Sequence, residues 1–481
     1  MNTTDGDWQQ VRARFQQIWG YEDFRPPQGE IIRSLLDGKD ALVVMPTGAG
    51  KSICFQLPAL LQDGLTLVVS PLIALMENQV RQLQQRHLPS ALLHSELPRR
   101  QQQQTLESLS RLRLLYLSPE TLLSSAIWER LSQPELSLKG LILDEAHCLV
   151  QWGETFRPEY QRLGAVRLAL QRRSPQNIAI AAFTATASPA DQQILERTLG
   201  LQQPERFCLN PYRNNLNLQV KIVWTPRCRR QQLRQFLEAK VGQTGLIYVR
   251  SRRDSETLAE WLRAQNFSTA AYHAGLSPQQ RRQIETDWLT GRLPFAICTS
   301  AFGMGIDKSD VRWIVHFHPP FLLNEYLQEV GRGGRDGRPT VALTLVSEPT
   351  GWLDPQDRQR QRFFADSRQR QYQQARQLLS QLPSQGQVSA TVRQFRSGEV
   401  ALSLLHRYGQ LEWSDPFHYR LNDRPSLPST AQFSREQGQL AAQMFQYLRT
   451  SQCRWGFLLD VSGFAEAARG FRCGHCDNCC R

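Results

Sequence analysis

The chain has 481 residues, enough for about three domains, and a formal net charge of +13. This charge favours a polyanionic partner, and because arginine supplies most of it, through a guanidinium that can fork onto phosphates and stack on bases, nucleic acid is the partner we expect. For any single basic cluster, such as Arg227, Arg229 and Arg230, a solvated surface is the simpler interpretation. The sequence has no apolar run of membrane-spanning length and no signal-peptide pattern at its start, so we expect a soluble cytoplasmic protein.

Short apolar runs alternate with helical patterns in two separate series, as parallel α/β sheets require. The first series predicts strands at residues 41–44, 65–70, 112–117, 139–144 and 178–183. The second predicts strands at residues 245–249, 268–272, 295–299, 313–317 and 341–346, with a connection around 210–224. We therefore predict an α/β fold with two parallel-sheet lobes, 1–208 and 209–346, followed by a mostly helical C-terminal region, 347–481.

A candidate phosphate-binding loop, residues 45–52, follows the first predicted strand. Gly48 and Gly50 lack Cβ atoms, so the backbone there can close around phosphate oxygens, with Thr47 in the same loop. Lys51 is then expected on the β- and γ-phosphates and Ser52 on Mg²⁺. Met45 stands where the strict pattern has its first glycine, so a plain glycine turn is the alternative for this loop taken alone.

Two further polar motifs strengthen the nucleotide hypothesis. Asp144 and Glu145 end the predicted strand at 139–144, a position that suits Mg²⁺ coordination by Asp144 and polarisation of the attacking water by Glu145. Far downstream, the glycine-rich run 328–337 carries Gln328, Arg332 and Arg335. Two arginines in such a setting, some 280 residues beyond a phosphate loop, are typical of a two-lobed nucleic-acid motor.

Five of the ten cysteines crowd the C-terminus. Cys453, Cys473, Cys476 and Cys479 have metal-ligand spacing, and four thiolates suit tetrahedral Zn²⁺. On spacing alone, His475 and Cys480 are rival ligands.

The chain resembles a superfamily-2 helicase, because it has four motifs in the order of that superfamily: the phosphate loop, the tetrad 144–147, the run 184–187 and the arginine motif. Further residues are similar to the RecQ family. Segments 70–72, 118–120, 272–275 and 299–308 also match segments that in the family line the DNA path or couple it to the nucleotide. The resemblance covers residues 8–346 and resumes at Cys453; it implies RecA-like lobes and favours Cys479 as the fourth zinc ligand.

The resemblance also assigns roles to individual residues. Tyr21, Arg25 and Gln28 match the family's adenine-reading segment. Residues 148–160 match its aromatic-rich loop, here called the aromatic-rich segment, in which DNA contacts are implied for Gln151, Trp152, Phe156 and Arg157. Where this chain has Glu154 and Thr155 the family usually has histidine and aspartate, which puts the coupling of DNA binding to hydrolysis in doubt. Arg332 and Arg335 would approach the γ-phosphate from the second lobe, where such arginines are worth about 10³–10⁵ in rate.

The resemblance implies a monomeric, nucleoid-associated, ATP-dependent 3′–5′ DNA helicase that acts on single-stranded and forked DNA in repair and recombination, with ATP, Mg²⁺ and Zn²⁺ as cofactors. An RNA helicase of the same superfamily is the nearest alternative, and a junction-binding module with a vestigial ATPase is the alternative from another class. The aromatic-rich segment and the cysteines argue against the first. The intact motor residues argue against the second.

Residues 371–421 exceed what the family normally places before its zinc module, which we expect at 440–481. A helix at 372–382, a short segment at 388–392, a helix at 398–407 and an alternating hairpin at 410–421 resemble a small winged helix. One interpretation is a contact with duplex DNA through Arg393, Arg396, Arg407 and Arg420. The other is a packing extension with a solvated basic face.

Overall fold

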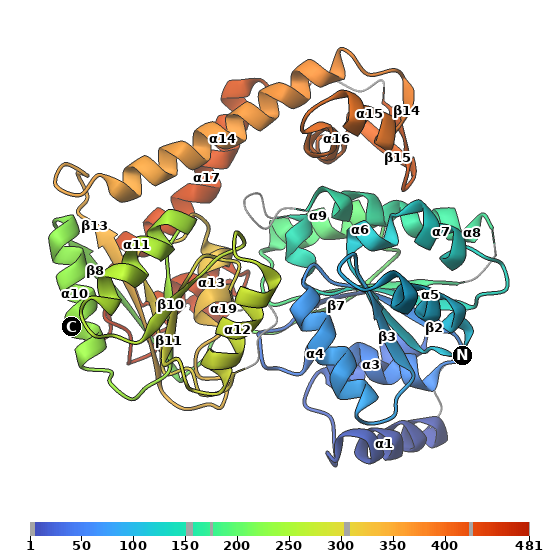
Figure 1. The fold of residues 1–481 in the computed structure, drawn as a ribbon, viewed down its shortest axis with the longest axis horizontal. Coiled ribbons are helices and arrows are strands. Elements are labelled where there is room, and N and C mark those ends of the chain that lie inside the picture. Colours follow the sequence, from blue (N-terminus) through green and yellow to red (C-terminus); the bar gives the residue numbers. More distant parts are fainter. Residues whose placement is uncertain (1–4, 151–156, 174–176, 303–307, 423–426, 481) are drawn as a thin grey trace. The chain divides into compact units, whose positions relative to one another are not determined.

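The computed structural model describes residues 5–150, 157–173, 177–302, 308–422 and 427–480. They form two compact units (Figure 1). The first unit contains most of the chain up to Leu209 together with Arg370–Pro428, and the second contains Asn210–Gln369 together with Ser429–Arg481. The C-terminal region 347–481 is therefore divided between the two units. No helix among the described residues is both long and apolar enough to cross a membrane.

The first unit is built on a seven-stranded parallel sheet with the order β3-β4-β2-β5-β6-β1-β7. Its strands are β1 (Ala41–Val44), β2 (Leu65–Val69), β3 (Ser90–Leu93), β4 (Leu114–Leu117), β5 (Leu138–Leu143), β6 (Ala179–Thr184) and β7 (Glu205–Cys208). All five predicted strands are present. The sequence prediction omitted β3 and β7, which are the two edge strands; edge strands are half exposed and lack a continuous apolar run.

Helices cover both faces of this sheet. Because successive strand residues point to opposite faces, Ala41 and Val43 join one apolar core while Leu42 and Val44 join the other. The α-helices are α1 (Asp5–Trp19), α2 (Gln28–Leu36), α3 (Lys51–Leu61), α4 (Ile73–Gln84), α5 (Arg99–Glu107), α6 (Pro119–Leu122), α7 (Ser125–Leu131), α8 (Val166–Gln171) and α9 (Pro189–Leu199). Short 3₁₀ helices are η1 (Leu109–Arg111), η2 (Ala146–Leu149) and η3 (Pro158–Ala165).

The second unit contains a six-stranded parallel sheet with the order β10-β11-β9-β12-β13-β8. Its strands are β8 (Leu216–Val223), β9 (Gly245–Tyr248), β10 (Thr269–Tyr272), β11 (Phe295–Cys298), β12 (Trp313–His316) and β13 (Thr340–Ser347). Its helices are α10 (Pro226–Glu238), α11 (Arg252–Arg263), α12 (Pro278–Leu289), α13 (Leu323–Val330), α17 (Thr430–Arg449), α18 (Arg454–Val461) and α19 (Ala465–Ala468), and α14 (Gln356–Leu379) begins here and continues into the first unit. The expected connection at 210–224 is in large part strand β8, whose alternating pattern buries Leu216 and Leu218.

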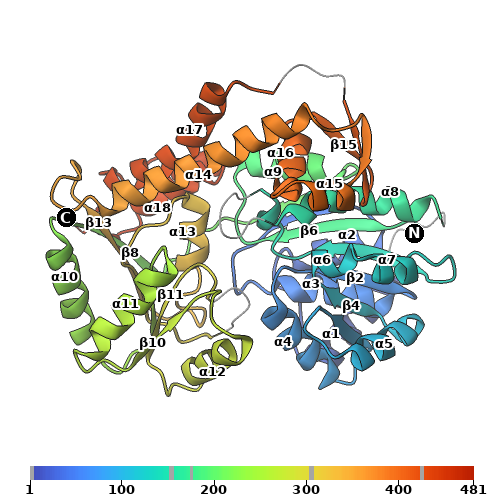
Figure 2. The same ribbon diagram turned by 45° about the horizontal axis from the view of Figure 1, so that its top comes forward.

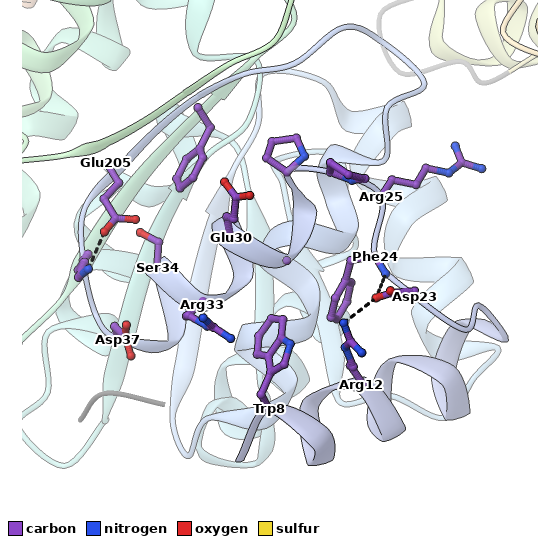
Figure 3. A pocket seen from close by; sticks show the side chains of 15 residues that line it. Trp8, Arg12, Asp23, Phe24, Arg25, Glu30, Arg33, Ser34, Asp37 and Glu205 are labelled. Carbon is purple, nitrogen blue, oxygen red and sulfur yellow. Dashed lines mark hydrogen bonds and ion pairs between the residues drawn. The ribbon is translucent and has the colours of Figure 1, made fainter. Parts of the chain in front are cut away.

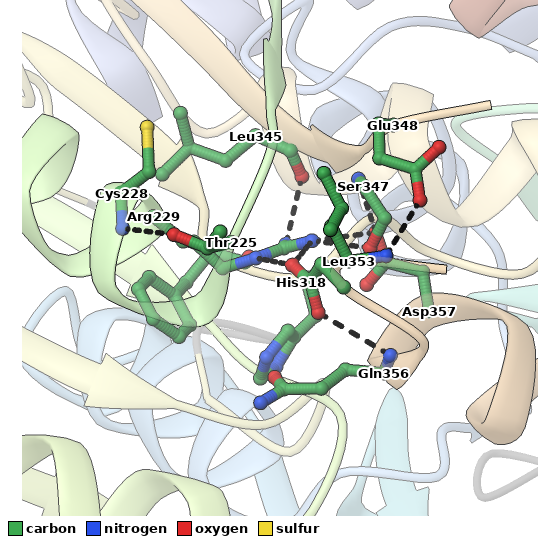
Figure 4. A network of polar contacts seen from close by, with 12 residues as sticks. Thr225, Cys228, Arg229, His318, Leu345, Ser347, Glu348, Leu353, Gln356 and Asp357 are labelled. Carbon is green, nitrogen blue, oxygen red and sulfur yellow. Dashed lines mark hydrogen bonds and ion pairs between the residues drawn. The ribbon is translucent and has the colours of Figure 1, made fainter. Parts of the chain in front are cut away.

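Arg229 does not belong to a solvated basic surface, as its sequence neighbourhood suggested. Its side chain is fully buried and donates hydrogen bonds to Asp354, to Asp357 and to the carbonyl oxygens of Phe317 and Leu345 (Figure 4). Two carboxylates and several acceptors satisfy the guanidinium, as a buried charge requires. The network therefore fixes the start of α14 against the sheet.

Residues 385–421 form a small domain, here called the inserted module. It contains β14 (Gln385–Gln387), α15 (Val388–Gln394), α16 (Gly398–Arg407), β15 (Leu411–Asp415) and β16 (His418–Leu421). The antiparallel sheet order β14-β16-β15, with two helices between β14 and β15, is the arrangement of a winged helix. Figure 2 shows α15, α16 and β15 of the module, which belongs to the first unit. Helix α16 lies against η3, and Phe417 packs edge-on against Trp128.

Candidate functional site

The phosphate loop connects β1 to α3 in the first unit. Gly48 and Gly50 have φ values of +83° and +82°, a left-handed conformation that glycine adopts without steric cost, and α3 begins at Lys51. The ammonium group of Lys51 is buried and has no hydrogen-bond partner among the described residues; it lies 4.0 Å from Oε1 of Glu145. A buried cation beside a glycine-rich helix N-terminus fits a phosphate group.

The acidic pair lies at the end of β5. Burial raises the pKa of Asp144 to about 6, and the Glu145 carboxylate acts in the same direction while Lys51 opposes it. Glu145 has a φ of +52°, an unusual conformation for a residue with a Cβ atom, and its carboxylate lies 3.2 Å from Nδ1 of His147. The buried Asp144 carboxylate lacks sufficient positive charge around it, and a divalent cation bound next to the phosphate loop would supply that charge. Ser52, the other predicted Mg²⁺ ligand, accepts a hydrogen bond from Gln79. The sequence prediction did not include Gln79 among the site residues.

The three adenine-reading residues, Tyr21, Arg25 and Gln28, have different surroundings. Gln28 is buried and its amide donates to the carbonyl oxygens of Ala49 and Gly50, at 3.1 and 3.4 Å, while its oxygen accepts from the backbone of Arg25. Tyr21 is 54% exposed and packs against Phe15. A cavity of about 500 Å³ lies beside α2 and is lined by Arg25 but by neither Tyr21 nor Gln28 (Figure 3). The structure thus ties Gln28 to the phosphate loop, and the adenine contacts stay predictions.

Of the predicted DNA contacts in the aromatic-rich segment, Gln151, Trp152 and Phe156 lie outside the described residues, as do Glu154, Thr155 and residues 303–307. Arg157 is described; it forms an ion pair with Glu120 and donates to the carbonyl oxygen of Pro71 at 2.9 Å. These contacts link the segment to two others that resemble family motifs, 70–72 and 118–120. A direct contact of Arg157 with DNA stays a prediction.

In the second unit, Gln328 lies in α13, and Arg332 and Arg335 follow in residues 331–335, here called the arginine loop. Gly334 has a φ of +55°, and a Cβ atom there would lie 2.5 Å from Nδ2 of Asn215. Arg213 donates to the carbonyl oxygens of Gly331 and Gly334, and Asn215 donates to the latter at 2.8 Å. The sequence prediction overlooked both supports, because it treated residues 210–224 as a connection.

Beside the arginine loop, Glu329 forms a buried cluster with Arg250 and His316, at 2.8 and 3.0 Å. Burial raises the pKa of Glu329, but Arg250 and the His316 hydrogen bond outweigh it and bring the pKa down to about 2. The charged carboxylate therefore holds α13 on the sheet. Arg250 directly follows the predicted strand 245–249. A charged residue at that position was the only feature of the sequence that could have indicated this cluster.

The four cysteines at the C-terminus come together. The Sγ atoms of Cys453, Cys473, Cys476 and Cys479 all lie within 4.8 Å of one another, a spacing that suits one tetrahedral ion. Backbone N–H groups donate to three of the sulfurs, as around thiolate ligands. The two alternative ligands do not belong to this cluster: His475 contacts Tyr212, and Cys480 is exposed.

The cysteine cluster adjoins strand β8 at the edge of the second sheet. Asp477 donates its backbone N–H to Leu218, and its carboxylate accepts from the backbone of Val220 and from Arg454. Trp455 donates to the carbonyl oxygen of Leu216. These contacts give the outer edge of β8 hydrogen-bond partners from the cysteine-bearing segment.

Comparisons with known proteins show which proteins this chain is similar to. A model of the DEAD/DEAH box helicases matches residues 25–194, and a model of the helicase conserved C-terminal domain matches residues 228–337. The protein "ATP-dependent DNA helicase RecQ" of Synechocystis sp. is 52% identical over 475 residues, 98% of each chain. A protein of the same name from Haemophilus influenzae is 41% identical over 70% of this chain, which spans 54% of that relative's length.

Two solved structures have a similar fold. The Mycobacterium smegmatis helicase Lhr bound to single-stranded DNA and AMP-PNP has a TM-score of 0.58 at 20% identity, over 86% of this chain and 60% of that chain. Saccharomyces cerevisiae Dbp5 bound to RNA and ADP BeF3 has a TM-score of 0.58 at 17% identity, over 74% of this chain and 90% of that chain. At such identities the likeness concerns the fold alone.

Proposed function

The chain belongs to the RecQ family of ATP-dependent DNA helicases, and on that premise we propose that it hydrolyses ATP to move 3′ to 5′ along single-stranded DNA and to open forked DNA. The observation that carries the proposal is the Lys51 ammonium, buried in a glycine cradle beside an acidic pair. We extend the proposal to a monomer that acts in repair and recombination, in the cytoplasm at the nucleoid.

In the proposed reaction, Gly48, Gly50 and Lys51 bind the β- and γ-phosphates. Mg²⁺, when bound to Ser52 and Asp144, supplies charge neutralisation on the phosphate oxygens. Glu145 orients the attacking water and accepts its proton. Arg332 and Arg335 stabilise the charge that develops on the transferred phosphoryl group. Hydrogen bonds from Arg213 and Asn215 hold the arginine loop in its conformation.

We propose that the cysteine cluster holds one Zn²⁺ with a structural role, because four thiolates leave no open coordination position for a reacting water. Elemental analysis of the purified protein tests this, and we expect one zinc per chain.

The polynucleotide is the main point to test. We expect the ATPase rate to be low without polynucleotide and to rise strongly with single-stranded DNA, less with duplex DNA and least with RNA. Lys51→Ala and Glu145→Gln should each abolish turnover while DNA affinity changes little. Equal stimulation by RNA would move the assignment to an RNA helicase, and DNA binding without turnover in the wild type would favour the junction-binding alternative.

The winged-helix arrangement of the inserted module supports a second, narrower proposal, contact with duplex DNA at a fork. Arg393, Arg396 and Arg420 are exposed, whereas Arg407 is half-buried and donates to the carbonyl oxygen of Val150, so we do not assign Arg407 to DNA. Replacing the three exposed arginines by alanine should weaken fork binding and lower its salt slope by up to about one per lost contact. An unchanged slope would leave the module with its packing role alone.

A further inference from the structure

Helix α16 of the inserted module contacts both ends of the aromatic-rich segment. Arg407 donates a hydrogen bond of 2.9 Å to the carbonyl oxygen of Val150, at the beginning of the segment. Ser403, which is 1% exposed, donates one of 3.2 Å to the carbonyl oxygen of Pro158, near its end. In winged-helix proteins, the helix in this position is the one that commonly enters the major groove of DNA. Here helix α16 contacts residues of the first unit instead.

An ion pair strengthens this contact. Arg162 in η3 lies 2.5 Å from Oε1 of Glu399 in α16, and its guanidinium also donates to the carbonyl oxygen of Pro416 in the hairpin. The Arg162 side chain is only 10% exposed. Because removing Glu399 would leave the largely buried charge of Arg162 without this partner, the pair constrains how α16 can lie on η3.

A third contact joins the same elements. Burial lowers the pKa of His406 to about 4, so the ring is neutral at pH 7, and its Nδ1 atom lies 3.3 Å from Oε1 of Gln161. The amide of Gln161 in turn donates to the carbonyl oxygen of Leu149, at 2.8 Å. The Gln161 oxygen therefore serves as the acceptor and His406 as the donor. In this way α16, η3 and η2 form one hydrogen-bonded unit.

The segments that α16 contacts also adjoin the acidic pair. Tyr160, which is fully buried, donates to the carbonyl oxygen of Asp144 at 3.4 Å. The backbone N–H of Cys148 donates to the carbonyl oxygen of Glu145, and that of Val150 donates to His147, so two consecutive turns connect Glu145 to Val150. A displacement of η2 and η3 would thus act on the residues assigned to water activation and Mg²⁺ binding.

We propose that the inserted module is a working part of the motor: Glu399, His406 and Arg407 are positioning residues that fix η2 and η3, and thereby set how strongly single-stranded DNA stimulates ATP hydrolysis. This inference rests on the proposed function, in which the aromatic-rich segment reports DNA to the acidic pair. It assigns to α16 a role that is independent of any contact between the module and DNA.

Charge reversal tests the proposal. Arg162→Glu and Glu399→Arg each place like charges across a contact of 2.5 Å, and the double variant restores opposite charges. We expect each single variant to lower kcat at saturating single-stranded DNA about tenfold, with the DNA concentration for half-maximal stimulation changed less than threefold. The double variant should recover kcat to within threefold of wild type. Glu412→Arg is the matched control, because Glu412 pairs with Arg420 at the exposed side of the same module.

Rescue by the double variant separates positioning from plain packing. If the single variants lower kcat with and without DNA in equal proportion, and the double variant does not restore it, the proposal is overturned. If a single variant does not fold, Arg407→Ala and Arg407→Lys take its place; stimulation should fall about fivefold in the first and recover at least in part in the second. A wild type that single-stranded DNA fails to stimulate would instead refute the proposed function, so the two failures are distinguishable.

Discussion

Replacing Gly50 by alanine probes the junction between the phosphate loop and the adenine-reading segment. The φ of +82° at Gly50 costs an alanine roughly 1–2 kcal/mol. The added Cβ atom would also lie 2.3 Å from Nε2 of Gln28, about 1 Å closer than an ordinary van der Waals contact. Gln28 can swing away, but it then loses its hydrogen bond to Ala49. Since a misplacement of about 1 Å in a site can cost 10²-fold, we expect kcat/KM for ATP to fall about 100-fold.

Gly38→Ala is the matched control in the same unit. Gly38 has a φ of +72°, so an alanine there carries the same backbone cost, yet its nearest neighbour, Nδ2 of Asn177, would lie at an ordinary 3.4 Å. Thermal unfolding should show similar destabilisation of both variants, while steady-state ATPase assays with saturating single-stranded DNA should show a loss only for Gly50→Ala. The reasoning fails if Gly50→Ala keeps kcat/KM within threefold of wild type, or if Gly38→Ala loses as much.

Three further results are expected. Arg213→Ala removes the donor to two carbonyl oxygens of the arginine loop, so kcat should fall about tenfold with KM for ATP nearly constant; a change in KM alone would contradict this support role. Glu329→Gln should destabilise the protein to urea by about 3 kcal/mol at neutral pH, because the pKa of Glu329 lies at about 2 instead of 4.5 and Arg250 loses its partner. This deficit should shrink as the pH falls from 4.5 to 2, and a constant deficit would speak against it. Cys476→Ser should abolish zinc binding and lower soluble yield, whereas Cys480→Ser should retain the metal by elemental analysis.

The sequence predicted the central strands well, since these are buried on both faces and appear as unbroken apolar runs. It failed at the sheet edges, where β8 alternates polar and apolar residues and resembles a connection. It also failed at Arg229, because a buried arginine depends on Asp354 and Asp357, more than 120 residues away in the sequence. Long-range partners leave no local pattern.

The residues of the candidate site also fall into two groups, those that a local sequence pattern indicates and those that it does not. Lys51, Asp144 and Glu145 could be found because each follows a strand in a short motif, and the four cysteines could be found from their spacing. The supports of these groups could not, because they come from remote segments. The inserted module shows this most clearly. Its helix α16 was predicted, whereas the prediction gave 388–392 only as a short segment where the structure has helix α15. The contact of the module with η3 depends on single side chains of two segments about 240 residues apart.

The contacts of Asp477 with β8 carry a consequence for how this protein behaves when stripped of metal. An uncovered strand edge presents unpaired N–H and C=O groups, which can recruit an edge from another chain. The loop that carries Asp477 lies between Cys476 and Cys479, so whatever keeps these thiols together also keeps the edge shielded. With zinc bound as proposed, treatment with a chelator should therefore produce intermolecular β-sheet and aggregates before the two parallel sheets unfold. The zinc ion would then protect the protein against aggregation.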